Sequence, residues 1–179
     1  MLKYSHMNKK AVVINSSNGY KGKWVSINRD EIVKPDGSKA EHEIAIRGDC
    51  VLILALDKDK ICLVKQFRYP ANEDLWEFPT GFINDDESPE DAAVREFTEE
   101  VGFRPLEIKQ VGSYWTWPGF STQKVNVFLL SNLVKSERKL DESESDLKYR
   151  FVKLETVFRM AKNGIIRSSA SLAALNYLI

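Results

Sequence analysis

The sequence is poor in several features that would place a protein in a specialised class. It has only 2 cysteines in 179 residues, and because both lie in apolar, strand-like runs we interpret them as reduced core residues, not a disulfide or a metal site. The 26 basic and 26 acidic residues cancel to zero net charge, which argues against a nucleic-acid partner. The longest apolar run, Cys50–Leu56, is too short to cross a bilayer.

The beginning of the chain also lacks the apolar stretch of a secretory signal peptide. We therefore expect a cytoplasmic protein without a membrane partner. A length of 179 residues with 43% hydrophobic content is enough for one globular domain with a real core.

The pattern of apolar runs and turn residues predicts a mixed α/β protein. An N-terminal β segment is expected first, with the turn signal "PDG" before its last strand. The runs "CVLILAL" and "KICLVKQF", separated by "DKDK", predict a hairpin. The strands of the N-terminal segment are expected at 11–16, 22–34 and 38–47. Further strands are expected near 108–116, 124–130 and 149–155. Two C-terminal helices are expected at 155–163 and 168–178.

The acidic stretch at residues 81–103, "GFINDDESPEDAAVREFTEEVGF", predicts a loop followed by a helix that begins at Ser88 and Pro89. Ser88 can cap its first amides, Pro89 suits the first helical position, and Gly102 suits the end. At 100° per residue, one face is expected to be apolar and another to carry three glutamates. The apolar face carries Val94, Phe97 and Val101. The acidic face carries Glu96, Glu99 and Glu100.

The three glutamates of this helix repel one another at their spacing. A solvated charged face is the ordinary interpretation, but residues 81–103 contain no lysine, and Arg95 is their only cation. Carboxylates brought together either raise their pKa values or bind a cation. Hard oxygen ligands favour Mg²⁺ or Mn²⁺, so a metal site for phosphate chemistry is the second interpretation.

The spacing of these residues resembles the Nudix box at every signature position. Gly81 is followed after five residues by Glu87, and after seven more by "REFTEEVGF". The resemblance implies a Nudix α/β/α sandwich with a mixed β-sheet at residues 45–179. The N-terminal antiparallel β segment, residues 1–44, then corresponds to a dimerisation region, which predicts a homodimer.

The segment "VKQFRYPANEDLWEFPTG" resembles the ADP-ribose and nucleotide-sugar pyrophosphatases of this family. The resemblance implies that Arg68 contacts the diphosphate or the sugar. Trp76 is a candidate for stacking on the base, with core or interface packing as the alternative, and Glu77 is a further substrate-binding candidate. Pro118, 15 residues after the box, matches a proline that marks the subgroup. Gln123 is a further substrate-binding candidate, where ADP-ribose enzymes often carry glutamate.

Residue by residue, the resemblance implies that Glu96 and Glu100 bind Mg²⁺ or Mn²⁺. Glu99 would be a further or water-mediated ligand, and the main-chain carbonyl of Thr80 another. Arg95 would hold Glu87 or Glu99 in its binding rotamer.

The polar loop at 136–146 falls where the subgroup carries a mobile catalytic acid. Glu144 and then Glu142 are the candidate general bases, Glu99 is the next, and a merely solvated linker is the alternative. The implied reaction is metal-dependent hydrolysis of the diphosphate bond of ADP-ribose or a nucleoside diphosphate sugar, giving a nucleoside monophosphate and a sugar phosphate. Hydrolysis of a nucleoside triphosphate or dinucleoside polyphosphate, and a non-catalytic nucleotide sensor, are the alternatives.

Overall fold

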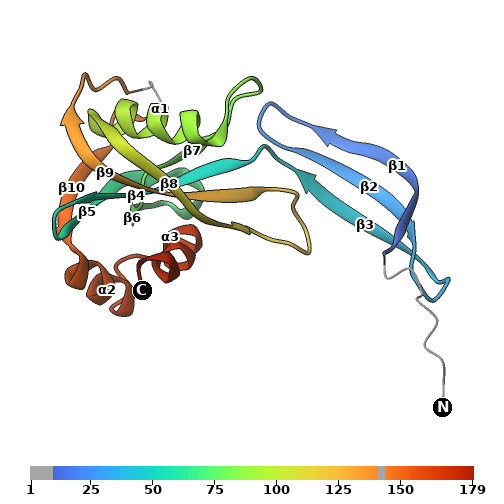
Figure 1. Cartoon of the computed structure of the whole chain (residues 1–179). Helices are drawn as coiled ribbons and strands as arrows, with labels where there is room; N and C mark the ends of the chain where they lie inside the picture. Colours follow the sequence, from blue (N-terminus) through green and yellow to red (C-terminus); the bar gives the residue numbers. More distant parts are fainter. Residues whose placement is uncertain (1–9, 141–143) are drawn as a thin grey trace, which may run out of the picture. The chain divides into compact units, whose positions relative to one another are not determined.

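A computed structural model describes residues 10–140 and 144–179 of the chain (Figure 1). The chain divides into two units. The first runs to Gly48 and includes Trp115–Gln123, and the second combines Asp49–Tyr114 with Lys124–Ile179. The acidic helix, α1 (Pro89–Val101), lies entirely in the second unit.

The first unit contains an antiparallel three-stranded sheet in the order β1-β2-β3, as predicted. Its strands are β1 (Val12–Lys21), β2 (Ser26–Val33) and β3 (Lys39–Ile46). The first strand is longer than expected, and the second begins later. The reason is that the turn between them lies at 22–25, where the Gly22 N–H donates to the Val25 carbonyl at 2.9 Å. All of β1 is exposed, and Ala45 is the only buried hydrophobic residue that the described part of this unit contains.

The second unit is built on a seven-stranded sheet. The path is β10-β5-β4-β9-β8, with β6 paired to β5 and β7 to β4. β4 and β9 are parallel, whereas β4 pairs antiparallel with β5 and β7, so the sheet is mixed. The strands are β4 (Cys50–Asp57), β5 (Lys60–Arg68), β6 (Glu73–Glu77), β7 (Thr80–Phe82), β8 (Phe103–Trp115), β9 (Lys124–Lys135) and β10 (Lys148–Lys153), with a short 3₁₀ turn η1 (Tyr69–Ala71) after β5.

Helices cover both faces of this sheet, which confirms the α/β/α arrangement (Figure 1). Along β4, Val51 and Ile53 pack on the α1 side, whereas Leu52 and Leu54 pack on the side of the C-terminal helices. This alternation follows from the two-residue period of a strand. The C-terminal helices are α2 (Leu154–Lys162) and α3 (Ser169–Ala174), and the last predicted helical turn is a 3₁₀ turn, η3 (Leu175–Leu178).

The ends of α1 are those that its sequence predicts. The Ser88 side chain accepts from the Asp91 amide at 3.1 Å, and Gly102 takes a left-handed φ of 79° with its N–H on the Thr98 carbonyl. The apolar face differs from the expectation in one respect. Val94 is only half-buried, whereas Glu100 is buried together with Phe97 and other residues of the helix.

Both cysteines carry free thiols, and burial raises the pKa of the Cys62 thiol. Within the described ranges, no helix is long and apolar enough to span a membrane.

Candidate active site

Arg95 organises the acidic side chains at the start of the site. Its Nε and Nη2 donate to the two carboxylate oxygens of Glu87 at 2.7 and 2.8 Å, a bidentate pair. Its Nη1 donates to Glu96 at 2.8 Å and to Glu99 at 3.2 Å, and Nη2 also reaches the Phe82 carbonyl at 3.0 Å. Arg95 thus contacts three glutamates, and its bonds lower the pKa of Glu87.

The Glu96 carboxylate packs directly against Gly81. A Cβ atom built on Gly81 would overlap the carboxylate carbon and both oxygens of Glu96. Gly81 is held in place by the pairing of β7 with β4, where it lies opposite Val51, and the Thr80 hydroxyl donates to the Val51 carbonyl at 2.7 Å. The first box residue is therefore glycine because a carboxylate from the helix occupies the space of a side chain.

Glu100 is the most deeply buried carboxylate of the site. It is 3% exposed, and its Oε2 has no hydrogen-bond partner among the described residues. Burial raises the pKa of Glu100 well above its usual range, and the charges of Glu144 and Glu96 raise it further. Burial likewise raises the pKa of Glu96, and the Arg95 bonds only partly oppose this rise.

Glu144, the first candidate base, influences both metal-ligand candidates. The charge of Glu144 raises the pKa of both Glu96 and Glu100, in each case less than burial does. The spacing of the box predicts the neighbours on the helix, whereas the electrostatic influence of Glu144 on them follows only from the folded chain. The second candidate, Glu142, lies outside the described residues.

Arg68 and Glu77 form an ion pair on the same side of the sheet as α1. Arg68 Nε lies 2.7 Å from Glu77 Oε2, and Glu77 is 8% exposed. Glu77 pairs in register with Val64, which packs in the core on the α1 side. Both charges act on Glu100, that of Arg68 lowering its pKa and that of Glu77 raising it.

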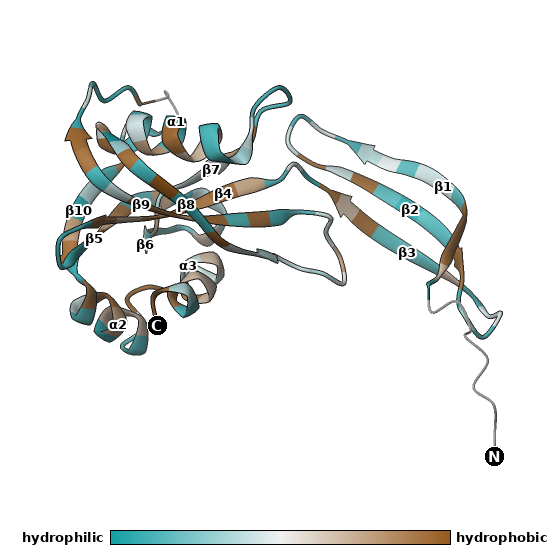
Figure 2. Ribbon diagram, viewed as in Figure 1, coloured by the Kyte–Doolittle hydropathy of each residue, from teal (hydrophilic) through white to brown (hydrophobic). Residues whose placement is uncertain are grey.

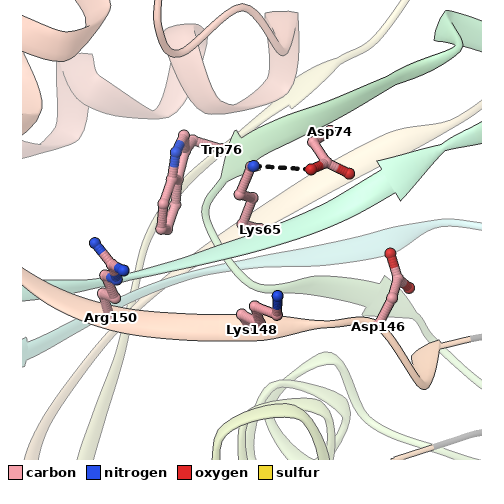
Figure 3. A pocket seen from close by; sticks show the side chains of 6 residues that line it. All are labelled: Lys65, Asp74, Trp76, Asp146, Lys148 and Arg150. Carbon is pink, nitrogen blue, oxygen red and sulfur yellow. Dashed lines mark hydrogen bonds and ion pairs between the residues drawn. The ribbon is translucent and has the colours of Figure 1, made fainter.

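Trp76 lies on the opposite face of β6 from Glu77, as successive strand residues must. It lines a groove of about 290 Å³ with Lys65, Asp74, Asp146, Lys148 and Arg150 (Figure 3). Lys65 pairs with Asp74 at 2.8 Å, and the Arg150 guanidinium lies 5.8 Å from the Trp76 ring centre. The structure therefore separates Trp76 from the face of the sheet that carries Glu77 and the box helix.

Pro118 and Gln123 belong to the first unit. Gln123 is buried there, and its side-chain amide donates to the Gly48 carbonyl at 2.9 Å. Pro118 is exposed in the connection between β8 and β9. The substrate-binding roles of these two residues stay predictions.

The residues of the site fit a divalent cation in donor type. Mg²⁺ commonly takes one or two carboxylates and completes its shell with water and substrate oxygens. Within the described ranges, no three carboxylate, imidazole or thiolate groups converge as a ready-made metal site. The buried Oε2 of Glu100 without a partner, and the Glu96 carboxylate over Gly81, are nevertheless hard oxygen donors of the required kind.

Two residues of the loop after β9 were missed by the sequence analysis, Arg138 and Asp146. Asp146 accepts a hydrogen bond from the Phe67 amide at 2.9 Å, and Arg138 donates to two main-chain carbonyls. Both lie in a run of charged and polar residues, where no local pattern distinguishes an anchoring side chain from a solvated one.

Comparison with known proteins identifies the family of this chain. The family model of the NUDIX domain matches residues 46–173. An ADP-ribose pyrophosphatase from Bacillus subtilis is 31% identical over 162 residues, which cover 89% of this chain and 87% of that protein. A methanol dehydrogenase activator from Bacillus methanolicus is 28% identical with the same coverage. An ADP-ribose pyrophosphatase from Mycobacterium tuberculosis is 28% identical over 90% of this chain and 80% of its own.

The fold is similar to that of a solved ADP compounds hydrolase. The two structures share a TM-score of 0.85 at 20% sequence identity, over 94% of this chain and 92% of the other. Together with the family match, the acidic helix and the mixed sheet, this defines the class: the chain belongs to the Nudix hydrolase family.

Proposed function

We propose that this Nudix protein hydrolyses the diphosphate bond of ADP-ribose or a nucleoside diphosphate sugar, giving a nucleoside monophosphate and a sugar phosphate. The observation that carries the proposal is the buried Glu100 oxygen that has no protein partner in the described part of the chain, on the same helix as the Glu96 carboxylate over Gly81. The two relatives named ADP-ribose pyrophosphatase support the choice of substrate class.

In this proposal, Glu96 and Glu100 hold Mg²⁺ or Mn²⁺, with Glu99 and the Thr80 carbonyl as further ligands. A bound divalent ion neutralises charge on the diphosphate and lowers the pKa of a coordinated water. Arg95 keeps Glu96 and Glu99 in place through its shared Nη1 bonds.

Glu144 is proposed to accept the proton of the attacking water. Arg68 is proposed to bind the diphosphate, with its guanidinium aimed by the nearly buried Glu77 at 2.7 Å. An arginine that already has one carboxylate partner loses less conformational entropy when it binds a phosphate. These roles use only residues from the second unit.

We also propose that the first unit mediates homodimer formation. Its sheet exposes large apolar side chains, and the described residues of the unit bury little beneath them. Figure 2 shows hydrophobic positions interspersed along these strands. Exposed apolar groups of this kind favour a protein interface, and a two-fold partner is the commonest one. The exposed residues include Val12, Val13, Ile14, Tyr20, Trp24 and Ile46.

A substrate panel tests the proposed reaction. ADP-ribose, ADP-glucose, GDP-mannose, UDP-glucose, GTP and a dinucleoside polyphosphate would be offered with Mg²⁺ or Mn²⁺, and phosphate would be measured after phosphatase treatment. We expect turnover of one or more of the diphosphate compounds and a large loss of it in Glu96→Gln. Preference for GTP or the polyphosphate would contradict the substrate class. Binding of these compounds without turnover would indicate a nucleotide sensor instead.

A further inference from the structure

The chain that leaves β9 folds back over the end of α1. Ser136 N–H donates to the Gly102 carbonyl at 2.9 Å, and Lys139 N–H donates to the Glu99 carbonyl at 3.1 Å. The last carbonyls of a helix have no partner within it, so they need donors from elsewhere. Residues 136–139 supply these donors at the turn that carries Glu99 and Glu100.

Arg138 connects this helix end to a second segment. Its Nε donates to the main-chain carbonyl of Glu100 at 2.6 Å, and its Nη2 donates to the carbonyl of Leu147 at 2.7 Å. The guanidinium also lies 5.4 Å from the Tyr149 ring centre. Because the donors of a guanidinium are fixed in one plane, a single side chain sets the spacing of the two carbonyls.

The Leu147 end of this link is itself anchored, and it carries Glu144. Leu147 is 3% exposed within the core on the α1 side, and its N–H donates to the Glu144 carbonyl at 2.8 Å. The neighbouring Asp146 carboxylate accepts from the Phe67 amide of β5 at 2.9 Å. The main chain at Glu144 is therefore tied to the core, to β5 and, through Arg138, to the main chain of Glu100.

We propose that Arg138 is a positioning residue that holds Glu144 at a set distance from the carboxylates of α1. The inference rests on the proposed function, in which Glu144 takes the proton of the attacking water. Arg138 touches neither that proton nor the substrate in this account. It acts by joining the main chain of one metal-ligand candidate, Glu100, to the turn that presents the base.

A double-mutant cycle tests whether Arg138 acts through Glu144. We expect Arg138→Ala to lower kcat roughly 10²-fold, the effect of misplacing a reacting group by about 1 Å. Substrate KM should change little. In a Glu144→Gln background, the same substitution should lower kcat by less than about 3-fold, since residues that act as one unit are not additive. Arg104→Ala, which removes an exposed arginine from β8, is the matched control and should leave kcat unchanged.

Arg138→Lys separates geometry from charge. Its single ammonium keeps the positive charge but cannot reproduce the planar fork to both carbonyls, so it should recover less than about a tenth of the lost activity. Full recovery would overturn the proposed geometric role. So would a kcat near wild type in Arg138→Ala, or additive losses in the cycle.

Amide hydrogen exchange gives a measurement that does not depend on turnover. Arg138→Ala should raise exchange at the Lys139 and Leu147 amides and leave the middle of α1 protected. Unchanged exchange at both would overturn the link. If the wild-type protein hydrolyses no diphosphate, the proposed function falls and the catalytic part of this inference falls with it. An active wild type with an equally active Arg138→Ala overturns the inference alone.

Discussion

Replacing Glu100 by glutamine should make the metal-free protein more stable while it removes activity. The effective penalty for an ionised carboxylate inside a protein is several kcal/mol. Glu100 is 3% exposed, its Oε2 has no partner among the described residues, and the charges of Glu144 and Glu96 oppose its ionisation. Glutamine has nearly the same shape as glutamate. Its buried amide atoms would still lack hydrogen-bond partners, which costs about 1–3 kcal/mol of stability.

The net gain in the free energy of unfolding should therefore be about 1–2 kcal/mol. For a chain of this length, that corresponds to a rise in Tm of roughly 2–8 °C. The gain should depend on pH. Because the pKa of Glu100 is raised in the folded state, the folded protein binds more protons than the unfolded one above the ordinary value near 4.5. Its stability then falls as pH rises.

The assay is thermal unfolding of both proteins with EDTA, from about pH 5 to about pH 8. The difference in Tm should grow toward the higher pH, because the unfolded wild-type chain releases the Glu100 proton that the folded protein retains. Turnover with Mg²⁺ should fall about 10²-fold or more, since metal-bound charge stabilisation is worth several kcal/mol. Glu99→Gln is the control, because its side chain is 40% exposed and should change stability by less than about 0.5 kcal/mol.

Two results would refute this reasoning. A Glu100→Gln protein that is less stable than wild type at every pH would show that the buried carboxylate is satisfied by the fold itself. Near-wild-type turnover at saturating Mg²⁺ would remove Glu100 from the set of metal ligands. Either result can occur without the other, so the stability argument and the metal assignment are tested separately.

Three further predictions follow from the contacts of the site. Gly81→Ala should fold with a nearly unchanged Tm, because the flexible Glu96 carboxylate can move away, but kcat should fall at least about 10-fold from its misplacement; a wild-type rate would contradict this. Glu144→Gln should lower kcat about 10²–10⁴-fold with little change in KM, and Glu142→Gln should cost much less; full activity of the double variant would move the base elsewhere. Sedimentation should show a dimer at tens of micromolar, and deletion of residues 1–40 should give a monomer; a monomeric full-length chain, or a deletion variant that remains a dimer, would exclude the proposed role of the first unit.

Much of the site was predictable because its spacing is local. Side chains three and four apart on a helix share a face, so Glu96, Glu99 and Glu100 were expected together from the sequence alone. The Ser88 cap and the Gly102 end are also local, and the structure confirms both. The resemblance to the Nudix box rests on this same short pattern, and the match of the NUDIX domain model to residues 46–173 shows the family.

Other features depended on partners that are distant in the sequence. The apolar face of α1 was predicted to include Val94, but burial is decided by which strand faces the helix, and the folded chain buries Glu100 instead. The partner of Arg95 was left open between Glu87 and Glu99. The bend of the chain between β7 and α1 brings Glu87 to the guanidinium, which binds both of them as well as Glu96.

The sequence by itself determined the fold class, the acidic helix and the family, because each depends on periodicity, capping residues or fixed spacing within short segments. Only the tertiary structure decided that Glu77, and not Trp76, lies on the face of the sheet that α1 covers, and that the charge of Glu144 acts on Glu96 and Glu100. Strand register and the anchoring of the main chain at Asp146 and Leu147 set these positions. Both are fixed by contacts between residues far apart in the chain, which no local pattern of residues encodes.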